Sequence, residues 1–181
     1  MFRTVQINKD NEKELGFKEL YEKSFPYEER VPYEELFKPP NNLVPDIKVF
    51  YVGDKFLGFF IAYQLKKYNY PVYMAIDENM RCKGYGQKIL TEILFNYTNK
   101  NPFVGDVESI RQNDAPNIEM RKRRHAFYNR IGIRDTGRYF TLSGVEYSIM
   151  TTSKEPIPDE DIDEMFEILK PMTDKVPKNK E

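Results

Sequence analysis

Residues that bind metals or form disulfides are scarce in this sequence. Its 181 residues include one cysteine, Cys82, and one histidine, His125. A single cysteine forms no internal disulfide, and one cysteine with one histidine supplies too few soft ligands for a zinc site. We therefore expect neither a disulfide framework nor a metal centre.

Net charge and long apolar runs are equally scarce. The 28 Lys and Arg residues nearly balance the 29 Asp and Glu residues, which leaves a formal net charge of -1. This balance disfavours a protein that holds nucleic acid by bulk electrostatics. No stretch approaches the roughly 18 apolar residues of a membrane helix, and residues 1–15 lack the apolar core of a secretory signal. We expect a cytoplasmic protein that binds neither nucleic acid nor membranes.

Aromatic residues and regular apolar patterns are abundant. The chain contains 13 Tyr and 13 Phe, too many aromatic residues for a disordered protein. Alternation with a period of two predicts strands, and apolar residues three and four apart predict helices. The expected strands are residues 1–7, 47–52, 56–65, 70–76, 103–110, 138–142 and 145–151. The expected helices are residues 11–24, 85–97, 118–131 and 159–169, with broken segments around Pro26 and Pro32.

The order of these elements predicts an α/β or α+β domain with a mixed sheet. Hairpins supply antiparallel strand pairs, and one helical crossover supplies a parallel pair. The expected apolar side of the helix over residues 118–131 consists of Met120, Phe127 and Ile131, and Gly132 ends that helix. We expect Asp159 to cap the last helix, whose apolar side consists of Ile162, Met165, Phe166 and Leu169.

A glycine-containing loop, residues 81–86, lies between a predicted strand and a predicted helix. Backbone N–H groups at a helix N-terminus favour an anion, and glycines let the main chain approach a phosphate closely. Arg81 and Lys83 add positive charge, so the loop predicts a phosphate or pyrophosphate site. A dinucleotide-binding pattern would need a third glycine where Ile89 stands, and no P-loop pattern is present. An ordinary strand-to-helix turn with solvated charges is the alternative.

This loop and a second segment together resemble a known enzyme family. Residues 76–90 resemble the central motif of the GNAT superfamily of N-acetyltransferases, whose [RQ]-x-x-G-x-[GA] loop wraps the pyrophosphate of acetyl-CoA. Its three fixed positions are matched by Arg81, Gly84 and Gly86. Residues 125–133 resemble the second motif of the family, in the matching residues Phe127, Tyr128, Gly132 and Ile133. The two motifs in this order are more specific than either alone.

The resemblance implies a fold, a co-substrate and a set of binding residues. The fold is a mixed, mainly antiparallel central sheet flanked by helices, with a splayed strand pair at the acyl-CoA site. Residues 1–152 would form the acetyltransferase domain, and residues 153–181 a C-terminal helix and tail of the same domain. Backbone groups of Ala75 and Ile76 would pair with the pantetheine arm. The residues expected around the pyrophosphate are Arg81, Cys82, Lys83, Gly84, Tyr85 and Gly86.

Two positions of the second motif depart from the family. The family commonly has Asn seven residues before the tyrosine and Ala four before it, where this chain has Arg121 and Arg124. An arginine can take over an Asn contact by pairing with a phosphate. Both arginines belong to the basic run 121–125, for which a solvated helix face is the alternative.

Acetyl transfer to an amine needs a proton for the departing thiolate and a neutral amine. Tyr128 matches the residue that the family places beside the CoA sulfur, where a phenol can protonate a thiolate. Glu108, which lies on the same strand face as Asp106, is the preferred general base. Alternatively, Glu108 is a salt-bridge partner or a surface carboxylate, and the base acts through a water molecule. Glu28 and Glu29 lie in a segment that resembles the family's cover over the acceptor site, where they would attract a cationic amine or act as rival bases.

The sequence therefore predicts an acyl-CoA-dependent N-acetyltransferase that moves an acetyl group from acetyl-CoA to a primary amine. The acceptor, a small molecule or a peptide, stays open, and so does the oligomeric state. One alternative is a catalytically silent CoA-binding regulatory module of the same fold. Another is a nucleic-acid-binding domain that uses the basic helix. Catalysis by Cys82 as a nucleophile is disfavoured, because no Cys-His pattern accompanies it.

Overall fold

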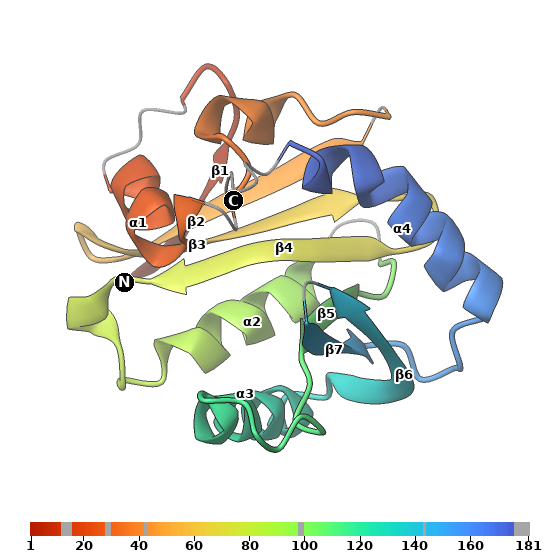
Figure 1. The fold of residues 1–181 in the computed structure, drawn as a ribbon. Coiled ribbons are helices and arrows are strands. Elements are labelled where there is room, and N and C mark those ends of the chain that lie inside the picture. The colour runs from red at the N-terminus through yellow and green to blue at the C-terminus, as the bar shows by residue number, and fades with distance from the viewer. Residues whose placement is uncertain (12–15, 28–29, 42, 98–99, 143, 176–181) are drawn as a thin grey trace. The chain divides into compact units, whose positions relative to one another are not determined.

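The architecture comes from a computed structural model of the chain (Figure 1). It describes residues 1–11, 16–27, 30–41, 43–97, 100–142 and 144–175. The strands are β1 (Phe2–Ile7), β2 (Val44–Val52), β3 (Lys55–Gln64), β4 (Asn69–Ile76), β5 (Val104–Glu108), β6 (Arg134–Leu142) and β7 (Val145–Thr151). The helices are α1 (Phe17–Ser24), α2 (Tyr85–Asn96), α3 (Ile118–Arg130) and α4 (Asp159–Thr173), with short 3₁₀ turns η2 (Tyr33–Phe37) and η3 (Glu78–Met80).

The strands form two hydrogen-bonded sheets. One has the order β1-β2-β3-β4 and the other the order β5-β7-β6. The strand pairs β1-β2, β2-β3, β5-β7 and β6-β7 are all antiparallel. An isolated parallel bridge joins Asn69, the first residue of β4, to Phe103, just before β5. The mixed, mainly antiparallel pairing is thus confirmed, and in the described part of the chain the parallel contact is this isolated bridge at the start of β4.

Most predicted elements are present, with two differences at helix starts. The N-terminal helix begins at Phe17, and residues 12–15 of the predicted helix lie outside the described residues. The predicted cap of the last helix is wrong: Asp159 is its first helical residue, and Pro158 stands at the N-cap without a side-chain hydrogen bond. Acidic residues in that first turn complement the positive end of the helix instead.

Packing divides the chain into two compact units. The first comprises Met1–Lys66, Pro71–Gly86 and Pro158–Glu181, and the second comprises Lys67–Tyr70 and Gln87–Ile157. α2 therefore begins in the first unit with Tyr85 and Gly86 and continues in the second. The expectation of one domain stays a prediction.

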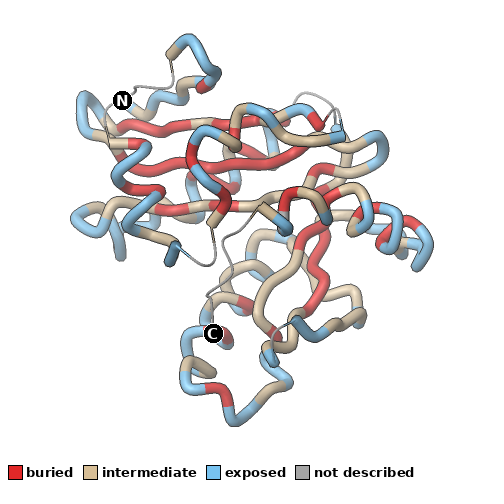
Figure 2. Tube along the Cα trace, turned by 45° about the horizontal axis from the view of Figure 1, so that its top comes forward, coloured by how far each residue is buried: buried red, intermediate tan, exposed pale blue. Residues whose placement is uncertain are grey.

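The core of the first unit is centred on β3. This strand is buried continuously from Leu57 to Tyr63, as Figure 2 shows for the middle of its sheet. A continuous apolar run is typical of a strand that is covered on both faces. Phe59 packs edge-on against Phe17 and Tyr21 of α1, with ring centroids 5.1 and 6.0 Å apart. Aromatic packing thus holds α1 on β3.

Two buried tyrosines hold the backbone at Val31, within residues 24–37. This segment is predicted to cover the acceptor site and is named the acceptor-side segment for that prediction. The Tyr21 hydroxyl donates a hydrogen bond to the Val31 carbonyl (2.6 Å), and the Val31 amide donates to the Tyr73 hydroxyl (3.1 Å). Both backbone groups of Val31 are therefore satisfied by side chains from α1 and β4.

Candidate active site

The predicted phosphate loop, residues 81–86, follows β4 and η3 and leads into α2. Its start is fixed by Asp77, whose side chain accepts a hydrogen bond from the Asn79 amide (2.9 Å) and whose own amide donates to β3 (2.9 Å). Cys82 and Gly84 then have positive φ angles of 59° and 75°. When residues with left-handed backbone angles alternate with residues of negative φ, successive backbone amides point to the same side. This is the geometry of an anion-binding nest.

The loop keeps its amides available. Among the described residues, no backbone carbonyl accepts a hydrogen bond from the amides of residues 82–86. No atom lies within 4 Å of the position that a Gly84 side chain would occupy. Open space beside unpaired amides at a helix N-terminus fits an anion such as a pyrophosphate.

The charged side chains of the loop stabilise its shape. Arg81 Nε donates to the Ile76 carbonyl (3.0 Å), and Lys83 Nζ donates to the Asn79 carbonyl (2.8 Å). Both residues are exposed, as is the thiol of Cys82. The loop therefore combines a fixed backbone with two cations at its surface.

β4 lies at the edge of its sheet, and its backbone groups alternate in direction. The Asp77 amide donates to β3, and the Ala75 carbonyl lies so close to Gly58 of β3 that a Cβ there would be 2.2 Å away. Ala75 therefore directs its backbone toward β3, whereas Met74 and Ile76 direct theirs to the free edge. The pairing of Ala75 and Ile76 with a pantetheine arm stays a prediction. The sequence alone does not show these backbone directions, because they depend on how β3 and β4 pair.

Tyr128, the predicted proton donor, lies on α3 in the second unit. Its ring contacts that of Phe127, with centroids 5.6 Å apart. Burial raises the pKa of Tyr128 above that of a free tyrosine, and the positive charge of Arg124, one helical turn earlier, opposes this rise. The phenol is therefore protonated at neutral pH, and its role as a proton donor stays a prediction.

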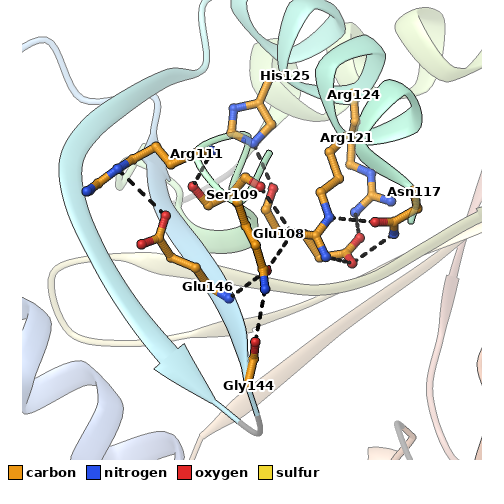
Figure 3. A network of polar contacts seen from close by, with 10 residues as sticks. Glu108, Ser109, Arg111, Asn117, Arg121, Arg124, His125, Gly144 and Glu146 are labelled. Carbon is orange, nitrogen blue, oxygen red and sulfur yellow. Dashed lines mark hydrogen bonds and ion pairs between the residues drawn. The ribbon is translucent and has the colours of Figure 1, made fainter. Parts of the chain in front are cut away.

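Glu108, the predicted base, lies in a network of polar contacts at the end of β5 (Figure 3). Its Oε1 accepts from Arg121 Nη2 (3.0 Å) and Asn117 Nδ2 (3.0 Å), and its Oε2 pairs with Arg124 Nη1 (3.2 Å). The carboxylate thus has a cation on each oxygen. These contacts agree with the salt-bridge alternative, and the role of Glu108 as a base stays a prediction.

The basic run 121–125 is divided between the interior and the surface. Arg121 and His125 are 3% and 4% exposed, whereas Lys122 and Arg123 are exposed. Met120, expected on the apolar side, is 55% exposed. The prediction that Met120 lies on the buried side of α3 is therefore wrong. The buried residues of this helix are Arg121 and His125, which are one turn apart.

Hydrogen bonds explain why α3 buries these polar residues. Arg121 donates to Asn117 Oδ1 (2.7 Å), the Ser109 carbonyl (3.1 Å) and Gln112 Oε1 (3.2 Å). His125 Nε2 lies 2.9 Å from the Glu108 carbonyl and must carry the proton, because a carbonyl only accepts. Buried polar groups with such partners escape the cost of unpaired burial. The guanidinium of Arg121 is thus occupied by protein groups.

Asp106, on the same strand as Glu108, has a different environment. The Tyr70 hydroxyl donates a hydrogen bond to Asp106 Oδ1. Burial raises the pKa of Asp106, and the Tyr70 hydrogen bond acts in the opposite direction. Tyr70 had no signal in the sequence, since its approach to β5 depends on the parallel bridge.

The acidic residues of the acceptor-side segment are only partly described. Glu28 and Glu29 lie outside the described residues. Glu34 forms an ion pair with Lys18 (3.3 Å), and Glu35 forms one with Lys175. In the chain as far as it is described, no group of three or more His, Cys, Asp or Glu side chains is placed to hold a metal ion. None of the described helices has the length and hydrophobicity needed to cross a membrane.

Comparison with known proteins bears on the fold. No protein-family model and no curated protein sequence matches the chain. A solved structure from Bacteroides thetaiotaomicron, assigned as an acetyltransferase of the GNAT family, matches 97% of this chain and 99% of its own, with a TM-score of 0.72 at 23% identity. This chain has the GNAT fold.

Two further GNAT-like structures match most of the chain. A Bacillus subtilis acetyltransferase in complex with CoA is 11% identical, covers 86% of this chain and all of its own, and has a TM-score of 0.55. The spermidine/spermine N-acetyltransferase SpeG from Vibrio cholerae is 13% identical, covers 83% of this chain and 93% of its own, and has a TM-score of 0.57. The GNAT resemblance of the two motifs is therefore confirmed at the level of the fold.

Proposed function

We propose that this protein transfers an acetyl group from acetyl-CoA to a primary amine. The observation that carries the proposal is the loop of residues 81–86, with unpaired amides and two left-handed residues, at the start of a helix in the GNAT fold. That loop suits the pyrophosphate of acetyl-CoA. A solved relative of the same fold has CoA bound.

Donor binding is proposed to combine the loop with the free edge of β4. The amides of residues 82–86 would hold the pyrophosphate, with Arg81 and Lys83 adding charge. Met74 would offer its backbone amide and carbonyl to the pantetheine arm, in the way an added strand pairs with a sheet edge. Ile76 would offer its amide, since its carbonyl already accepts from Arg81 Nε. Acetyl-CoA supplies the activated acyl group as a thioester.

Tyr128 is proposed as the proton donor in direct transfer. The amine nitrogen attacks the thioester carbonyl, so that a C–N bond forms and the C–S bond breaks. Tyr128 gives its proton to the departing sulfur, and the proton that the amine loses restores the neutral phenol. The base for the amine is Glu108 as predicted from sequence, or a water, and the two ion pairs of Glu108 favour the water.

The acceptor is proposed to be a cationic amine. The acceptor-side segment carries Glu28, Glu29, Glu34 and Glu35 against the single cation Arg30. Glu34 and Glu35 pair with Lys18 and Lys175, so the proposal rests on Glu28 and Glu29. A negative segment attracts a positive substrate. One relative of the same fold is named for the polyamines spermidine and spermine.

A second candidate is a catalytically silent CoA-binding regulatory module. It is favoured by the contacts of Glu108, because both oxygens of this predicted base are already paired with arginines. Such a module would bind acetyl-CoA through the same loop without turnover.

Thiol release from acetyl-CoA, measured with a panel of polyamines, amino acids and peptides, separates the two candidates. We expect turnover with a cationic amine, and a fall in kcat of about ten- to a thousandfold in Tyr128→Phe, the scale of a lost proton donor, with unchanged affinity for acetyl-CoA. Tyr139→Phe is the matched control in the same unit and should retain full activity. No release with any amine, in a protein that binds acetyl-CoA, would support the silent module.

A further inference from the structure

The carboxylate of Glu108 forms ion pairs with two arginines, Arg121 and Arg124, whose other contacts differ. The side chain of Arg121 is 4% exposed, and its other donors are taken by Asn117, Ser109 and Gln112. The side chain of Arg124 is 35% exposed, and its described ion pair is the one with Glu108. Arg121 therefore anchors α3 to the end of β5, whereas Arg124 keeps an open side.

Arg124 and Tyr128 are four residues apart on α3, so they lie on the same face of the helix. Glu108 fixes Arg124 on that face through Oε2 and Nη1, 3.2 Å apart. The charge of Arg124 lowers the pKa of Tyr128 against the larger effect of burial. Among the described residues, Glu108 of β5 forms an ion pair with Arg124, and Arg121 of the same helix shares that carboxylate.

We infer that Glu108 positions Arg124, and that the guanidinium of Arg124 stabilises the negative charge that develops between the Tyr128 hydroxyl and the leaving thiolate. This inference rests on the proposed function. As the C–S bond breaks, the electron pair passes to sulfur and the proton of Tyr128 follows, so negative charge moves from sulfur to the phenolate oxygen until the proton of the amine restores it. A fixed cation beside this path lowers the energy of the charged states.

The same geometry explains why Glu108 is better suited to position Arg124 than to accept a proton. Each of its oxygens pairs with an arginine, so both oxygens are engaged in holding these two side chains. Protonation would also leave Arg121, buried at 3% exposure, without its counter-charge. Glu108 therefore acts through Arg124 as a positioning residue.

The first test measures the titration of Tyr128 itself, by NMR of tyrosine-labelled protein with Tyr128→Phe to assign the signal. Arg124→Gln should raise the pKa of Tyr128, because a cation that favours the phenolate has been removed. Arg124→Lys should restore part of the difference. Arg123→Gln, one residue away and exposed, is the matched control and should leave the titration unchanged. An unchanged titration in Arg124→Gln would overturn the inference whether or not the enzyme turns over.

The second test measures kcat and the KM for acetyl-CoA with an amine that the wild type uses. Arg124→Gln should lower kcat by about ten- to a hundredfold, with little change in KM, because the charge develops in the transition state. Glu108→Gln should add little to the loss in the double variant with Arg124→Gln, since both substitutions remove one function. Independent, multiplicative losses would contradict the positioning role, because they would assign Glu108 a separate function as a base or as the counter-charge of Arg121.

The two failures are distinguishable. If the titration shifts but the wild type turns over no amine, the proposed function and the role of Arg124 in catalysis both fall. If turnover is present and Arg124→Gln retains it in full, only the inference falls. The Arg124 variants leave the buried pair of Arg121 with Glu108 intact, so they decide the matter even where Glu108→Gln does not fold.

Discussion

At the residue scale, Asp106 is a carboxylate whose surroundings favour its protonated form. Burial raises its pKa, and the hydrogen bond from the Tyr70 hydroxyl offsets only part of that effect. Glu108, two residues along the same strand, instead faces two arginines. Two acidic residues on one strand thus have opposite environments.

Asp106 should make stability depend on pH in a defined direction. Because its pKa is higher in the folded than in the unfolded protein, its contribution is fully present below about pH 4 and is lost as the pH rises through the folded-state pKa. Asp106→Asn keeps an oxygen that accepts from Tyr70 but does not ionise. We therefore expect the free energy of unfolding of the variant, measured in urea, to rise relative to that of the wild type as the pH increases from about 3.5 to about 7. A difference that stays constant with pH would contradict the assigned environment.

The sequence predicts some site residues and not others for physical reasons. The glycines of the loop are predictable because positive φ at Gly84 and close approach of an anion both require that residue type. The burial of Arg121 is not, because a run of charges has the same local pattern at the surface and in an ion-pair network. The ion pair of Arg121 with Glu108 of β5 distinguishes the buried network from a solvated helix face, and the local charge pattern does not predict this contact.

At the scale of elements, β3 and β4 approach each other closely at one glycine. A Cβ at Gly58 would lie 2.2 Å from the Ala75 carbonyl oxygen and 3.0 Å from the Ile76 Cα, both backbone atoms of β4. Backbone atoms in a paired strand have little freedom to move away. The close approach of β3 and β4 therefore requires a residue without a side chain at position 58.

Gly58→Ala should destabilise the fold more than another glycine substitution does. We expect a loss of roughly 2–3 kcal/mol from forced separation of β3 and β4. Gly53→Ala is the control, since Gly53 has nothing within 4 Å and only its positive φ resists a side chain, at about 1 kcal/mol. Denaturant unfolding of both variants gives the comparison. Equal losses would mean that the contact of Gly58 with β4 is not tight.

The pattern of apolar residues predicts β2 and β3 better than it predicts α3. The strands of the hairpin bury apolar runs on either side of Gly53, so composition and burial agree. In α3, hydrogen bonds rather than apolar contacts determine which side is buried, and a polar side chain gives no periodic signal of its own partners.

At the scale of the whole molecule, two motifs about 40 residues apart predict the fold better than any single element does. The loop of residues 81–86 belongs to the first compact unit, and Tyr128 belongs to the second. The GNAT fold found in the comparisons accommodates both motifs in this order. The strand pairing followed from hairpins and one crossover, whereas the division into two units had no counterpart in the sequence.

Binding of acetyl-CoA to the loop is the central claim, and isothermal titration calorimetry tests it most directly. The wild type should bind acetyl-CoA. Gly86→Leu should remain folded, since leucine suits a helix, but should show no measurable binding because its side chain occupies the site of the pyrophosphate. Thr91→Leu, on an exposed position later in the same helix, should bind like the wild type. Unchanged affinity in a folded Gly86→Leu variant, or no binding by the wild type, would contradict the account.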